Sequence, residues 1–165
     1  MERVVIAVNR RPRRSEKLLR IAMAALTVLF LLMGILVSRG MMLPCFLMAM
    51  AYFVYAGLSK RAWEYVLENG TLRIDRLTDR GRATLHEIAL KEIEALARPD
   101  DPAVAMYKKG GAVKVPKYDY TSYAEGVSWY TLIAMEDGKK IKLLLDLNDE
   151  AIRFIRRENR QSVKV

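Results

Sequence analysis

Two long apolar stretches dominate the first third of the chain. Residues 21–38 and residues 41–58 each lack any acidic or basic side chain, whereas most of the remaining sequence is polar. A helix of about 18 residues is close to the length needed to cross the hydrocarbon core of a bilayer. The pattern therefore predicts two transmembrane helices, joined by a very short turn around Arg39 and packed against each other as an antiparallel hairpin.

A period of two replaces the continuous apolar pattern after residue 61. Apolar and polar side chains alternate on both sides of Asn69-Gly70, and again on both sides of Asp137-Gly138 over residues 127–145. Asn-Gly and Asp-Gly are strong signals for two-residue hairpin turns. These two segments therefore predict two antiparallel β-hairpins.

The segment 83–97 fits two patterns. Thr84, His86 and Ile88 alternate as in a strand, but Leu85, Ile88 and their neighbours also approximate a helical stripe. We favour a strand followed by a short strand over residues 93–98, because an isolated hairpin needs further strands to be stable. Pro and Gly residues at 99–102 and 109–111 predict a middle region rich in loops.

A helix is predicted over residues 148–160, with Asn148 as its N-cap and an apolar stripe that includes Ile152 and Ile155. The fold class is thus a membrane α-hairpin plus an α+β domain: a small antiparallel sheet or barrel closed by the C-terminal helix. We place a basic segment at residues 1–20, the helical hairpin at 21–58 and the β domain at 62–160. Residues 62–165 are expected to fold without the hairpin.

The net charge of +9 is unevenly distributed. Residues 1–20 contribute +5, Arg39 +1, and Lys60 and Arg61 +2, which leaves +1 for residues 62–165. A nucleic-acid-binding domain would carry the excess itself, so we expect no nucleic-acid partner. Basic residues gather at the cytoplasmic ends of membrane helices. The distribution predicts a multi-pass membrane protein with both termini in the cytoplasm.

Two motifs resemble a known family. Tyr65-Val-Leu67-Glu-Asn69-Gly-Thr-Leu72 forms the predicted strand pair, and Ile88-Ala-Leu90-Lys-Glu-Ile93 follows it. With two preceding spans, an Asp-Gly hairpin and a closing helix, the chain resembles an uncharacterised family of small bacterial two-span membrane proteins with a C-terminal pleckstrin-homology-like (PH-like) domain. The resemblance implies a PH-like fold. It implies no activity and no site residues.

Candidate chemistry is sparse. His86 is the only histidine, and its pattern favours a half-buried strand residue over a general base. Cys45 falls within a predicted span, so it cannot act as a nucleophile beside His86. Met41, Cys45 and Met48 share one helix face, but methionine is more often a packing residue than a ligand. We therefore expect no enzyme activity, no metal and no cofactor.

Lysines and aromatic residues alternate between Tyr107 and Tyr130, a mixture that suits a membrane interface. The same aromatics could instead fill the core beneath a long loop. The candidate contact residues are Lys108, Lys109, Lys114, Lys117, Tyr118, Tyr120 and Tyr123. The predicted function is a membrane-anchored cytoplasmic interaction module that binds a protein, a second copy of itself or anionic lipid headgroups. The alternative is an accessory subunit of a transporter or channel complex.

Overall fold

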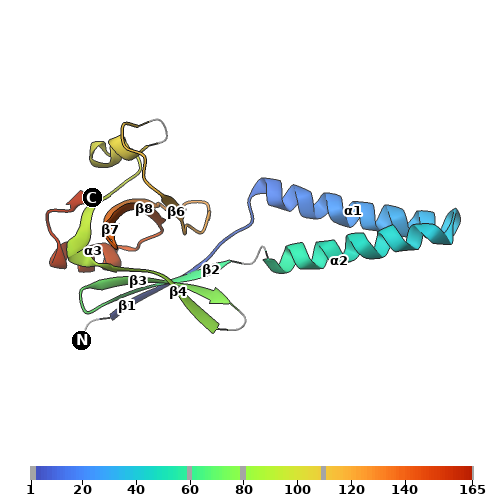
Figure 1. Ribbon diagram of the computed structural model, residues 1–165, viewed down its shortest axis with the longest axis horizontal. Helices are drawn as coiled ribbons and strands as arrows, with labels where there is room; N and C mark the ends of the chain where they lie inside the picture. Colours follow the sequence, from blue (N-terminus) through green and yellow to red (C-terminus); the bar gives the residue numbers. More distant parts are fainter. Residues whose placement is uncertain (1–2, 59–60, 79–80, 109–110, 165) are drawn as a thin grey trace. The chain divides into compact units, whose positions relative to one another are not determined.

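The chain divides into two compact units. In this computed structural model, residues 3–58, 61–78, 81–108 and 111–164 are described (Figure 1). One unit comprises residues 1–10 and 61–165, and the other comprises residues 11–60. Below we call them the sheet unit and the helical unit.

The helical unit is a hairpin of α1 (Arg14–Leu36) and α2 (Met42–Leu58), joined through the short 3₁₀ helix η1 (Arg39–Met41). The two helices approach each other closely at the turn, where a Cβ added to Gly34 of α1 would lie 3.1 Å from the sulfur of Met42 of α2. Helix α1, and η1 together with α2 (Arg39–Leu58), are long and apolar enough to cross a membrane, and only 6% and 0% of their apolar windows are buried. Length and composition thus agree with the predicted spans.

The first sheet of the sheet unit has the order β1-β2-β3-β4 and is antiparallel throughout. Its strands are β1 (Arg3–Asn9), β2 (Ala62–Glu68), β3 (Thr71–Thr78) and β4 (Gly81–Ala89). Asn69 and Gly70 connect β2 to β3 with φ of 53° and 73°, as a type I′ turn requires. The predicted hairpin is therefore present, and residues 81–89 form a strand as favoured above.

Strand β1 corrects the boundaries drawn from the sequence. Residues 1–20 were expected to form one basic segment, but residues 3–9 pair along their whole length with β2. Val4 and Val8 of β1 are 3% and 5% exposed and belong to the main core. A β domain bounded at residues 62–160 therefore omits one strand. The helical unit is inserted between two adjacent strands of one sheet.

The second sheet has the order β6-β8-β7-β5-β9. Its strands are β5 (Ile93–Ala97), β6 (Lys117–Asp119), β7 (Tyr130–Glu136), β8 (Lys139–Leu145) and β9 (Val163–Lys164). The predicted hairpin around Asp137-Gly138 is β7-β8, although β7 begins at Tyr130 and not at residue 127. The sequence did not predict β6, β9 or the 3₁₀ helix η3 (Pro102–Tyr107), which lies after β5.

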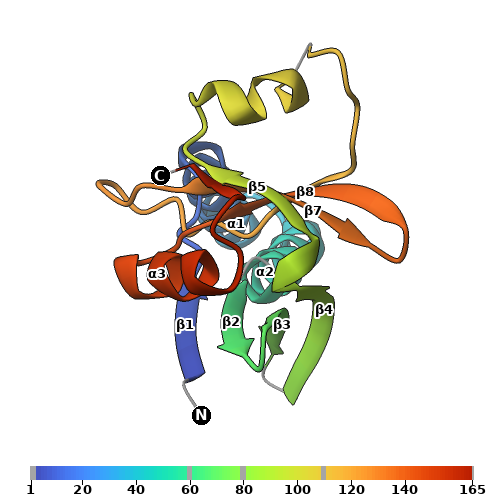
Figure 2. The same ribbon diagram turned by 90° about the vertical axis from the view of Figure 1, so that its left-hand side faces the viewer.

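Helix α3 (Asp149–Glu158) packs beside both sheets (Figure 2). Asn148 caps it as predicted, because its Oδ1 accepts from the backbone N–H of Ala151 at 2.9 Å. Its apolar face joins residues of the two sheets in a single core. After the helix, Asn159 donates to the carbonyls of Leu90 and Ile93 at 3.0 and 2.9 Å. These bonds attach α3 to the 3₁₀ turn η2 (Leu90–Glu92) between the two sheets.

Candidate functional site

The candidate contact residues do not form one surface. Lys109 lies outside the described residues, and Lys114 is exposed in the loop before β6. The other candidates separate into three groups: a cluster of lysines on the second sheet, a buried group at the seam between the sheets, and a contact near the connections to the helical unit.

The first group, the lysine cluster, consists of Lys108, Lys117 and Lys142. Lys117 of β6 is the register partner of Lys142 of β8, so their side chains share one face of the sheet. Lys142 donates from Nζ to the carbonyl oxygen of Tyr107 at 2.8 Å, beside Lys108. Burial lowers the pKa of Lys142, and the charges of Lys117 and Lys108 lower it further.

Lys140 provides a contrast on the same strand and face. Its Nζ lies 2.6 Å from Oε2 of Glu94 and 3.3 Å from the hydroxyl of Tyr107. The hydrogen bond to Glu94 and the one to Tyr107 raise its pKa. The charge of Lys140 is thus balanced by the carboxylate of Glu94. The charge of Lys142, two residues later, is instead close to the like charges of Lys117 and Lys108. The sequence did not indicate Lys142 as a site residue. Lys140 and Lys142 alternate with the apolar Ile141 and Leu143, which marked them only as the polar face of a hairpin.

The second group lies at the seam between β4 and the second sheet. Nδ1 of His86 is 2.6 Å from Oε2 of Glu136, and Nε2 is 2.8 Å from the hydroxyl of Tyr120. Tyr118 packs edge-on against the imidazole, with ring centroids 4.6 Å apart. His86 and Tyr120 are each 8% exposed, whereas Tyr118 is 39% exposed. Tyr120 therefore presents little surface to a partner, and only Tyr118 of this pair could touch one.

Both ring nitrogens of His86 are engaged, so neither is free to accept a proton from a substrate in this arrangement. Burial raises the pKa of Tyr120 to about 12, and nearby Tyr118 and Glu136 act in the same direction. Its hydroxyl therefore remains protonated at neutral pH, within hydrogen-bond distance of Nε2 of His86. This group joins the two sheets by hydrogen bonds within a buried seam.

The third group lies where β1 leads towards the helical unit. Arg10 donates from Nη2 to the hydroxyl of Tyr123 at 2.7 Å, and its guanidinium lies 5.6 Å from the ring centroid of Trp63. The Tyr123 hydroxyl donates to Oδ2 of Asp119 at 2.5 Å. Tyr123 has a φ of 53°, which is unfavourable for a bulky side chain. These contacts hold the loop after β6 against the end of β1.

Asp119 completes the third group. Burial acts to raise its pKa, but hydrogen bonds from Tyr123 and Thr121 and the charge of Arg10 outweigh burial. The pKa of Asp119 is therefore lowered, and its carboxylate is held in the ionised form. Sequence reasoning found Tyr123 but missed Arg10, because the two residues are remote in the chain.

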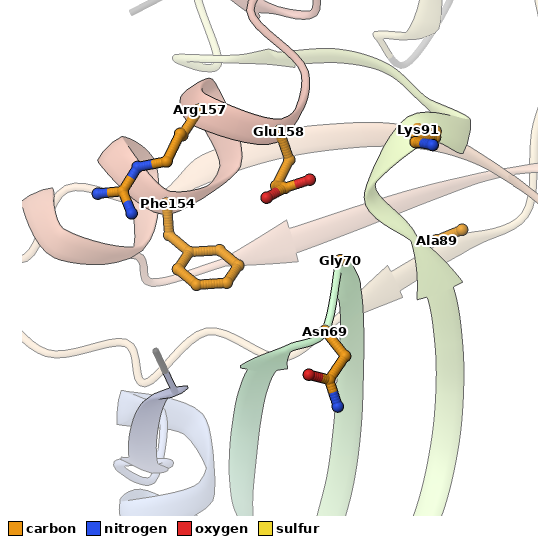
Figure 3. A pocket seen from close by; sticks show the side chains of 7 residues that line it. All are labelled: Asn69, Gly70, Ala89, Lys91, Phe154, Arg157 and Glu158. Atoms are coloured by element: carbon orange, nitrogen blue, oxygen red, sulfur yellow. The ribbon is translucent and has the colours of Figure 1, made fainter. Parts of the chain in front are cut away.

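A hollow of about 420 Å³ lies at the opposite end of β2 from the helical connections. The β2-β3 turn, the end of β4, η2 and α3 surround it, and Figure 3 shows the ring of Phe154 facing that turn. A Cβ added to Gly70 would lie 3.9 Å from Oε2 of Glu158. Lys91 and Arg157 also line the hollow, so it combines both signs of charge around one aromatic ring.

A second hollow, of about 550 Å³, follows the free edge of β1. The N–H of Arg10 bonds to the carbonyl of Arg61, so alternate residues of β1 face β2. The backbone groups of Ala7 and Asn9 therefore point towards the free edge. Val127 and Leu147 form part of the opposite wall.

Comparison with known proteins agrees with this architecture. Residues 4–165 match the model of the family described as "Bacterial PH-like domain (DUF6106)". No curated protein and no solved structure matches the chain significantly. Because the match covers nearly the whole chain and includes β1, the chain belongs to this bacterial PH-like family, and a PH-like domain suggests an interaction module.

Proposed function

We propose that this bacterial PH-like protein is a membrane-anchored interaction module, with α1 and α2 as two membrane spans and the sheet unit in the cytoplasm. The observation that carries the proposal is the pairing of β1 with β2 on either side of the helical unit. Paired strands must lie on the same side of a bilayer. An even number of spans between them meets that requirement.

The surface of the helical unit supports the same proposal. Its large side chains remain exposed, among them Leu29 at 50%, Ile35 at 64% and Phe53 at 74%. Apolar surface of this extent on two neighbouring helices is unfavourable in water but suits lipid. The basic residues before α1 and after α2 favour the cytoplasm for the sheet unit.

Binding is proposed in preference to catalysis. The histidine is saturated by Glu136 and Tyr120, and the burial of Tyr120 keeps its hydroxyl protonated. Among the described residues, no group of three or more His, Cys, Asp or Glu side chains is placed to hold a metal ion. The sheet unit has surface features that a partner could bind: the lysine cluster, the hollow at the β2-β3 turn, and the hollow along the free edge of β1.

Membrane fractionation tests the anchoring. The full chain should stay in the membrane pellet after alkaline carbonate washing. A variant in which a short Gly-Ser linker replaces residues 11–60 should be soluble, because Arg10 and Arg61 are register neighbours about 5.5 Å apart between Cα atoms. Release of the full chain by carbonate would contradict the proposal.

A further inference from the structure

In the described part of the chain, no ion pair joins Lys117 or Lys142 of the lysine cluster to a carboxylate. Lys117 and Lys142 are directly opposite on neighbouring strands, where like charges are destabilising. Of the nearby acids in the described structure, Glu94 pairs with Lys140 and Asp100 pairs with Lys108. The pKa of Lys142 is lowered by burial and by the positive charges of Lys117 and Lys108. An anion bound here would relieve that repulsion.

The position of Lys142 is fixed by the backbone. Its ammonium has three N–H donors, and one bonds to the carbonyl of Tyr107 at 2.8 Å. That bond fixes the ammonium of Lys142 next to Lys117 and near Lys108. Its other N–H donors can bond to a ligand. The three ammonium groups lie on β6, on β8 and at the end of η3. Such a set suits a ligand with several anionic oxygens, such as a phosphate.

Apolar side chains border the same region. Met106, two residues before Lys108, is 50% exposed, and Val113 in the following loop is 39% exposed. The N–H of Val113 donates to the carbonyl of Met106 at 3.2 Å, so the two residues are held together. Apolar side chains beside lysines are typical of surfaces that enter the headgroup region of a bilayer. A freely soluble phosphate would not need them.

From these observations we propose that Lys108, Lys117 and Lys142 bind the phosphate headgroups of anionic phospholipids in the bilayer that anchors the chain. This proposal rests on the proposed function, since anchoring provides a high local concentration of headgroups. The proposal also changes the set of candidate contact residues predicted from the sequence. Lys142 becomes the central residue, and the buried Tyr120 is excluded.

The test uses the full chain in nanodiscs made either of phosphatidylcholine or of phosphatidylcholine with phosphatidylglycerol. A neutral acylating reagent is added, and mass spectrometry measures how fast each lysine reacts. Lys139 is the internal reference, because it is exposed on β8 but lies on the opposite side of that strand from Lys142. Phosphatidylglycerol should slow acylation of the lysine cluster about fivefold relative to Lys139.

Variants separate a specific site from general surface charge. In the double variant Lys117→Gln with Lys142→Gln, the protection of Lys108 by phosphatidylglycerol should largely disappear. Lys139→Gln removes a charge from the same strand and should leave that protection intact. Retained protection in the double variant would show that Lys108 does not depend on the cluster and would overturn the proposal.

Two further outcomes would also overturn it. One is equal acylation in the two kinds of nanodisc. The other is equal protection by inorganic phosphate added to phosphatidylcholine discs, which would indicate a site for soluble phosphate. A chain that enters neither kind of disc would contradict the proposed anchoring itself and would remove the basis for lipid contact. Failure of the anchoring is thus distinguished from failure of the lysine cluster.

Discussion

The backbone N–H of Arg10 donates to the carbonyl of Arg61 at 3.0 Å, although the whole helical unit lies between them in the sequence. This bond continues the β1-β2 ladder by one residue beyond Asn9 and Ala62. The two connections to the helical unit therefore leave the sheet side by side. The hairpin is an insertion in a PH-like sheet, and β1 is needed to complete that sheet.

The first prediction concerns the autonomy of the sheet unit. The sequence alone suggested that residues 62–165 fold without the hairpin, but the position of β1 reverses that expectation. Residues 61–165 alone should aggregate or fold poorly, because β2 loses its partner and the core loses Val4 and Val8. Residues 1–10 joined by a short linker to residues 61–165 should give a monomer with well-dispersed amide NMR signals. Equally good spectra from both proteins would mean that β1 is dispensable.

A second prediction compares two valines of β1. Val8 is 5% exposed and Val5 is 45% exposed. Val8→Ala should lower the free energy of unfolding by about 2 kcal/mol, since it removes buried methyl groups and leaves a cavity. Val5→Ala should change it much less. Urea unfolding of the linked sheet unit measures both values, and similar losses would argue against the burial of β1.

The third prediction addresses the seam between the sheets. Tyr120→Phe leaves Nε2 of the buried His86 without its partner, which should reduce the free energy of unfolding by about 1–3 kcal/mol. Tyr118→Phe is the matched control, because Tyr118 packs on the same imidazole but is 39% exposed. A control as damaging as Tyr120→Phe would show that the hydrogen bond is not the important contact.

The same tyrosine predicts a pH dependence. Its folded-state pKa is raised from 10.0 to about 12, chiefly by burial. The unfolded chain therefore loses this proton first as the pH rises, and stability present below pH 10 should be lost between about pH 10 and pH 12. Burial also raises the pKa of Tyr65, which adds to the effect. Tyr120→Phe should flatten the decline, and an unchanged slope would contradict this assignment.

Local signals explain which elements could be predicted. The Asn69-Gly70 and Asp137-Gly138 turns and the Asn148 cap act over a few residues, so β2-β3, β7-β8 and α3 follow from the sequence. Strand β1 differs, because residues 4–8 form a short apolar run without alternation. Its partner is also separated from it by two helices. The short strands β6 and β9 likewise depend on distant neighbours.

The candidate site was only partly predictable for the same reason. The spacing of Lys108 and Lys117 indicated a basic surface, but Lys142 joins it through long-range structure. The register of β6 against β8 sets Lys142 opposite Lys117, and its bond to the carbonyl of Tyr107 brings it near Lys108. Composition could not distinguish Tyr118, on the surface of the seam, from Tyr120 inside it. The contact of Arg10 with Tyr123 requires β1 to be in the sheet.

The most direct test of the proposed anchoring is cysteine accessibility in intact cells. Cys45 is first replaced by alanine, and single cysteines are then introduced by Val5→Cys in β1, Glu125→Cys in the loop before β7, and Arg39→Cys in the helical turn. All three positions are exposed. An impermeant thiol reagent should label only the cysteine at position 39, and all three after permeabilisation. Labelling of positions 5 and 125 in intact cells, or protection of position 39, would contradict the cytoplasmic two-span arrangement.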